Sequence, residues 1–271
     1  MLIRIYSIVK KKHLSFHKRT LLAGAYIKIR ILRFCIGRFI SPQKIKKISA
    51  LGYVININGF DDFYWTFLEV FIEEEYYFLT DESSPTILDL GGHIGVTVLY
   101  FKWLYPDANI TVFEPLQENN HILEKNVTEN KLTNIILEKK AVGGSTGTRS
   151  FYGEGRAGFV GNDTAADVEV VNQVSVTILS EYITDTITFC KMDIEGSEAA
   201  VIKELEDHNK LHHIKHLVME FHKKDSSNKL SDIVASLEKV SMSVSFMSDL
   251  NPLHIKKRDF THIMLVATSQ V

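Results

Sequence analysis

The chain has little cysteine, no acidic residue in its first 60 positions and no long uninterrupted apolar run. Two cysteines in 271 residues, Cys35 and Cys190, exclude a disulfide framework and favour a reducing, cytoplasmic location. An apolar share of 45% excludes wholesale disorder. The length fits one α/β domain of up to about 250 residues with an extension.

The missing acids make the charge distribution uneven along the chain. Residues 1–60 hold 13 of the 31 Lys and Arg, which leaves 18 basic residues against all 33 acidic ones. The sequence therefore predicts a basic N-terminal extension, residues 1–60, on an acidic domain, residues 61–271. Such an extension can be purely structural, or it can contact an anionic membrane, a nucleic acid or the acidic face of its own domain.

The most apolar early stretch, residues 21–40, does not qualify as a transmembrane helix or a signal peptide, because cations interrupt it. Those cations are Lys28, Arg30, Arg33 and Arg38. They do not share one helical face, which argues against an interfacial helix. The alternation of Ile27, Ile29 and Ile31 with cations is equally typical of a strand.

Short apolar runs alternate with helical patterns along the rest of the chain. Strands are expected over residues 86–90, 109–113, 134–137, 188–192, 217–221 and 260–267, with helices after most of them. This alternation predicts a Rossmann-like, doubly wound α/β fold, a mainly parallel seven-stranded sheet with helices on both faces. Ligands of such sheets bind beyond the carboxyl ends of the strands. The residues to examine are therefore 89–95, Glu114, Ala141, Val142, 193–198 and 220–222.

The first of these strand ends carries a glycine loop. Gly91 and Gly95 permit a tight turn, and the helix that follows offers free N–H groups. A dinucleotide fingerprint would need glycine where Leu90 stands, so the loop suits a cationic amino-acid ligand, with Asp89 facing its ammonium, better than a pyrophosphate. The alternative is an ordinary turn between strand and helix.

Two further strand ends carry acids. Glu114 is placed to accept hydrogen bonds from both hydroxyls of a ribose, the alternative being a solvated strand end. Asp193 is placed to face a methyl donor and its acceptor. Glu195 and Glu198 either cap the next helix or contact the substrate.

Three segments together resemble the FkbM family of methyltransferases: residues 87–95 (ILDLGGHIG), 113–115 (FEP) and 191–198 (KMDIEGSE). The likeness covers roughly residues 75–222. It implies S-adenosylmethionine as methyl donor and hydroxyls of sugars, polyketides and related natural products as acceptors. By the same resemblance Asp89, Gly91 and Gly95 would line the methionine part of the donor and Glu114 its ribose. Gly92, His93, Pro115, Ala141 and Val142 are assigned to the cofactor site with them; family members often have Ala-Asn where Gly92-His93 stands.

The general base is expected to be His222, because a histidine titrates near neutral pH, with Asp193 as the rival. A surface histidine without a role is the alternative. No metal is assigned, although Asp193, Glu220 and His222 together could take a divalent cation.

The sequence thus predicts a cytoplasmic S-adenosylmethionine-dependent O-methyltransferase that acts on a saccharide, a glycolipid or a related natural product. A peripheral contact of the basic extension with an anionic membrane is compatible with it. The rivals are an NAD(P)-dependent oxidoreductase, which Leu90 disfavours, and an inactive binding module of the same fold. A nucleic-acid methyltransferase is not expected, because no Asn-Pro-Pro-Tyr-like motif follows residues 188–192.

Overall fold

The computed structural model describes residues 1–36, 38–41, 44–152, 159–161, 170–223, 228–247 and 262–270. The chain forms two compact units. The first contains residues 1–77, 94–104 and 118–133, and the second contains residues 78–93, 105–117 and 134–271. The basic segment thus shares a unit with helices from the centre of the chain.

The first unit is mostly helical. Its elements are α1 (Leu2–Lys10), α2 (Phe16–Cys35), β1 (Lys47–Ala50), β2 (Tyr53–Asn56), α3 (Phe60–Phe67), the π-helix η2 (Leu68–Glu73), α4 (Val96–Leu104) and α5 (Gln117–Glu129). Ser15 begins α2 by accepting a hydrogen bond from the N–H of Lys18. The helix runs through Ile27, Ile29 and Ile31, so the strand alternative for that alternation is wrong.

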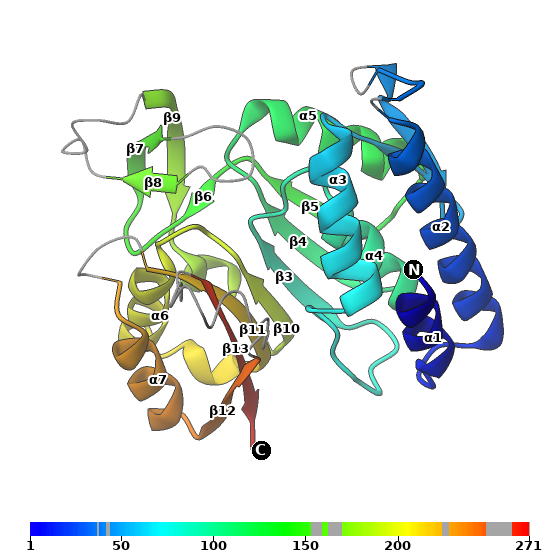
Figure 1. Ribbon diagram of the computed structural model, residues 1–271. Helices are drawn as coiled ribbons and strands as arrows, with labels where there is room; N and C mark the ends of the chain where they lie inside the picture. Colours follow the sequence, from blue (N-terminus) through cyan, green and yellow to red (C-terminus); the bar gives the residue numbers. More distant parts are fainter. Residues whose placement is uncertain are drawn as a thin grey trace, which may run out of the picture. The chain divides into compact units, whose positions relative to one another are not determined.

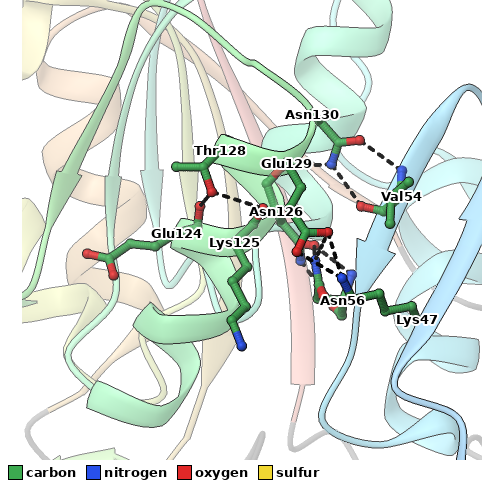
Figure 2. A network of polar contacts seen from close by, with 9 residues as sticks. All are labelled: Lys47, Val54, Asn56, Glu124, Lys125, Asn126, Thr128, Glu129 and Asn130. Carbon is green, nitrogen blue, oxygen red and sulfur yellow. Dashed lines mark hydrogen bonds and ion pairs between the residues drawn. The ribbon is translucent and has the colours of Figure 1, made fainter.

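Asn126 of α5 and Asn130, the residue after the end of α5, tie the β1–β2 hairpin to this unit (Figure 2). The Asn130 amide accepts from the N–H of Val54 and donates to its carbonyl, both at 2.8 Å. The Asn126 amide pairs in the same way with the backbone of Asn56, at 2.6 and 3.1 Å, and also donates to the Ile94 carbonyl. Asn126 and Asn130 are four residues apart, about one helical turn, and their partners Asn56 and Val54 are two apart on β2, so both pairs are in register. The two side chains thereby bond to the backbone N–H and C=O groups at the open edge of β2, as a neighbouring strand would.

The second unit is built on a seven-stranded sheet in the order β12-β13-β11-β10-β3-β4-β5. Neighbouring strands are parallel, except that β13 is antiparallel to both β11 and β12. The strands are β3 (Thr86–Leu90), β4 (Asn109–Phe113), β5 (Ile135–Glu138), β10 (Ile187–Met192), β11 (Ile214–His222), β12 (Met242–Met247) and β13 (His262–Ser269). The predicted Rossmann-like, mainly parallel sheet is confirmed. The first two residues of the closing strand expected over 260–267 lie outside the described part.

Sequence reasoning missed β12. Its signal is the alternation of Val244 and Phe246 with serines, which is typical of a strand with one polar face. The apolar stripe of the helix just before it, α7 (Leu230–Lys239), is the more regular pattern in this part of the sequence.

Helices α6 (Glu198–Asp207) and α7 cover the β10–β13 part of the sheet, with the short 3₁₀ turns η4 (Leu179–Tyr182) and η5 (Leu211–His213) beside them (Figure 1). Val201 and Leu205 of α6 and Ile233 and Leu237 of α7 are buried in one cluster with the strand residues. A smaller four-stranded sheet, in the order β6-β9-β7-β8, belongs to the same unit. Its strands are β6 (Ala141–Val142), β7 (Gly147–Tyr152), β8 (Phe159–Gly161) and β9 (Val170–Thr177).

Candidate active site

Strands β10, β3 and β4 end level with one another. Leu90 is paired with Met192 on one side and with Phe113 on the other. The next residues, Asp193, Gly91 and Glu114, therefore lie at the same carboxyl edge. The strand order reverses between β3 and β10, which is where ligands of such sheets bind.

The loop after β3 is held against both neighbouring strands. The N–H groups of Gly91 and Gly92 donate to the Phe113 carbonyl at 3.0 and 2.9 Å. Gly91 has φ +87°, and a Cβ placed on it would lie 2.0 Å from the carbonyl oxygen of Asp193. The protein itself therefore requires glycine at this position, because the end of β10 fills the space that a side chain would need.

Glu114 is buried, and both oxygens of its carboxylate are bonded to backbone. One oxygen accepts from the N–H of His93 at 2.9 Å, and the other accepts from the N–H of Leu116 at 2.9 Å. His93 has φ +48°, a left-handed conformation that aims its N–H at the carboxylate. Each carboxylate oxygen has two acceptor positions.

Lys191 of β10 links two of the predicted acids of this edge, Asp89 and Asp193, and sequence reasoning gave it no role. Its side chain is 2% exposed, and its ammonium donates to the Gly91 carbonyl at 2.7 Å. It lies 3.4 Å from a fully buried Asp89 oxygen and 3.6 Å from an Asp193 oxygen. Burial lowers the pKa of Lys191, but the two carboxylates outweigh it and raise that pKa overall. A lysine inside an otherwise apolar strand was the available signal.

A second cluster surrounds the buried side chain of His222, at the end of β11. Its Nδ1 lies 3.2 Å from a Glu198 oxygen, and its Nε2 lies 3.5 Å from Glu220 and 3.6 Å from Glu195. Burial by itself lowers the pKa of His222. The contacts with Glu198 and Glu220 and the charges of Glu195 and Asp193 reverse this and raise it to about 10. The ring is therefore an imidazolium at neutral pH.

Glu198 is fully buried, and its neighbours account for both of its oxygens. One accepts from the N–H of Gly196 at 2.9 Å and faces His222, while the other accepts from the Asn228 amide at 2.7 Å. Glu198 is the first residue of α6, and the backbone N–H bonded to it is that of Gly196, before the helix. Because its side chain is 0% exposed, direct contact with a substrate would require a rearrangement of this cluster. The partner role of Asn228 had no sequence signal.

Asp193, Glu195 and Glu220 are the partly exposed carboxylates of this cluster, with side chains 27%, 19% and 28% exposed. Burial raises the pKa of Asp193 to about 6, partly offset by Lys191 and reinforced by Glu220. Ligand atoms of Asp193, Glu195 and His222 all lie within 4.8 Å of one another, a spacing that a divalent ion could bridge. In the structure the His222 imidazolium supplies positive charge among these carboxylates.

The remaining predicted cofactor residues are Gly95, Pro115, Ala141 and Val142. Gly95, with φ +84°, directly precedes α4 in the first unit, where a Cβ would lie 3.1 Å from Leu123 Cγ. Pro115 follows Glu114 and is half-buried. Ala141 and Val142 form the short strand β6 of the smaller sheet, and both are buried.

Comparison with known proteins finds similarity to methyltransferases. The family model described as the methyltransferase FkbM domain matches residues 89–250, more than half of the chain. "Methyltransferase 1" of Beauveria bassiana is 24% identical over 163 residues, which are 51% of this chain and 66% of that protein. "Methyltransferase sdnD" of Sordaria araneosa is 33% identical over 81 residues, 30% of this chain and 31% of that one.

Among solved structures, methyltransferase FkbM from Methylobacillus flagellatus is similar with a TM-score of 0.47 and 18% identity, over 70% of this chain and 44% of that one. The chain thus spans just under two thirds of the length of the Beauveria protein, about a third of the Sordaria protein and under half of the Methylobacillus protein. None of the described helices combines the length and hydropathy that a bilayer-spanning segment requires.

Proposed function

The chain belongs to the FkbM family of methyltransferases, and we propose that it transfers the methyl group of S-adenosylmethionine to a hydroxyl of a saccharide, a glycolipid or a related natural product. The resemblance found in the sequence is thereby confirmed at the level of the family.

The observation that carries the choice of donor is the charge of the strand-end edge. Six carboxylates lie there, those of Asp89, Glu114, Asp193, Glu195, Glu198 and Glu220, against the two cations Lys191 and His222. An edge with excess negative charge suits a ligand with a sulfonium and an ammonium. It repels the pyrophosphate of a nicotinamide dinucleotide, which disfavours the oxidoreductase alternative.

S-adenosylmethionine, when bound, supplies an electrophilic methyl group on its sulfonium. Glu114 would hold the ribose hydroxyls through its carboxylate, and the N–H groups of His93 and Leu116 fix the orientation of that carboxylate. Asp89 is paired with Lys191, so its contact with the donor's ammonium stays a prediction.

Asp193 is the better candidate for the general base. With its pKa at about 6 it is ionised at neutral pH, yet it is more basic than an ordinary aspartate. It would accept the acceptor's hydroxyl proton as the oxygen forms its bond to the methyl carbon and the carbon–sulfur bond breaks. His222 carries a proton already at that pH, so we assign it to holding Glu195 and Glu220 in place, not to the base role predicted for it.

Calorimetric titration with S-adenosylmethionine tests the donor assignment. Glu114→Ala should weaken binding about 10- to 100-fold, since hydrogen bonds to a charged group contribute about 1.5–3 kcal/mol. Glu238→Ala, an exposed carboxylate on α7, is the matched control and should bind as the unmodified chain does. Binding of NAD in place of S-adenosylmethionine would refute the proposal, and so would unchanged affinity in the Glu114 variant.

The acceptor is tested separately, by transfer of a labelled methyl group over a panel of saccharides, glycolipids and polyketide alcohols. A product labelled on nitrogen or carbon, or on a nucleic acid, would contradict the hydroxyl assignment while leaving the donor assignment intact. Binding of the donor without transfer to any hydroxyl would favour the inactive binding module.

A further inference from the structure

One side of helix α2 exposes large apolar side chains, although Leu22, Tyr26 and Ile29 on its other side are buried. Phe16, Ile27, Ile31 and Phe34 are 79%, 37%, 58% and 67% exposed. At 100° per residue these four side chains fall within an arc of about 60°, and residues 27, 31 and 34 have the four-and-three spacing of a single helical face. We call this set the apolar face of α2. A surface helix normally buries such a stripe and exposes its charges.

Three cations of α2 are bonded to other parts of the first unit. The Lys18 ammonium donates to the carbonyls of Trp103 and Leu104. The Arg30 guanidinium donates to the Tyr64 hydroxyl at 2.8 Å, and Arg33 is paired with Asp61. The cations are therefore used for contacts within the protein, which explains why they share no exposed face.

Helix α1 has the same orientation. Leu2, Ile3, Tyr6 and Val9 are 78%, 84%, 64% and 55% exposed, while Ile8 is fully buried. Exposed Lys10 and Lys12 follow directly. Two consecutive helices thus place large apolar side chains in water, and isolated surface apolar residues do not explain so regular a pattern.

We propose that the outward faces of α1 and α2 bind in the interface of a bilayer that contains anionic lipid. Neither helix is suited to span a bilayer, and α2, with 20 residues, is about 30 Å long, so it would lie along the surface with Phe and Ile among the acyl chains. Exposed cations adjoin these faces: Lys10 ends α1, Lys12 follows it, and Lys28 lies on α2. Anionic headgroups complement that charge.

The same charge argues against a second copy of the chain as the occupant. A symmetric dimer through these faces would bring the exposed Lys10, Lys12 and Lys28 of one copy close to those of the other. The bilayer is the partner that supplies apolar depth and negative charge at once.

Flotation of the full chain with lipid vesicles tests this inference. The protein should float with phosphatidylcholine vesicles that contain phosphatidylglycerol, and at least 10-fold less with pure phosphatidylcholine. The double variant Ile31→Glu/Phe34→Glu should lose at least 10-fold in vesicle binding. Leu79→Glu is the matched control, because Leu79 is 70% exposed and lies in the other unit, and it should float as the unmodified chain does.

A second readout keeps the test independent of the folding of the double variant. Phe34→Trp preserves the apolar face, and its fluorescence should shift to the blue on addition of the anionic vesicles. Unchanged flotation of the double variant, or no shift in the tryptophan variant, would overturn the inference. So would equal binding to neutral vesicles, or a dimer in light scattering that the double variant dissociates. Donor binding does not depend on this surface, so the two proposals fail separately.

Discussion

Replacing Gly91 by alanine tests the packing of the strand-end edge, and Gly52 provides a matched control. The two glycines have nearly the same backbone, with φ +87° and +86°. A Cβ on Gly91 would lie 2.0 Å from the Asp193 carbonyl oxygen, whereas no described atom outside the neighbouring residues lies within 4 Å of a Cβ on Gly52. The pair of variants therefore separates backbone strain from steric overlap.

The left-handed backbone costs an alanine about 1–2 kcal/mol at either position. At Gly91 the overlap adds about 1–3 kcal/mol, the usual cost of overpacking, because the obstacle is backbone and cannot rotate away. We expect Gly52→Ala to lose about 1–2 kcal/mol of unfolding free energy and Gly91→Ala about 2–5 kcal/mol. Parting the loop from β10 would also lengthen the 2.7 Å bond from Lys191 to the Gly91 carbonyl.

Urea denaturation followed by circular dichroism measures both free energies, and calorimetry measures donor affinity in the folded variants. Gly91→Ala should also bind S-adenosylmethionine less tightly, while Gly52→Ala should not. Equal destabilisation by the two substitutions would refute the reasoning, since it would mean that the Asp193 carbonyl does not restrict position 91.

Two pH-dependent predictions follow from the cluster around His222. Turnover should rise as pH passes about 6, where Asp193 loses its proton, and a pH–rate profile measures this rise. The substitution Asp193→Asn should lower turnover by about 10²–10⁴-fold. A profile that is flat between pH 5 and 7 would count against Asp193 as the base. The native pKa of His222, about 10, lies above its ordinary 6.5, so its stabilising contribution is complete below about pH 6.5 and is lost as pH rises toward 10. The stability advantage over His222→Gln, from urea denaturation at each pH, should shrink across that window, and a constant difference would contradict the assigned charge.

Local patterns in the sequence determined much of the architecture. Runs such as residues 86–90 and 188–192 are mostly apolar because both faces of a central parallel strand are covered, and the structure has strands there. The strand-end rule then selected Gly91, Glu114 and Asp193, which the register brings to one edge. The family follows from the same residues.

What only the tertiary structure decided is which charges meet. Sequence spacing cannot show that Lys191 links Asp89 to Asp193, or that Glu198 turns inward to His222, because these pairs join separate strands and a helix. Since the pKa of His222 depends on four neighbouring carboxylates, the charge on the imidazole could not be read from the chain. The orientation of α2 is decided in the same way. Its stripe is visible in the sequence, but which side faces water depends on the partners that its cations find in the folded unit.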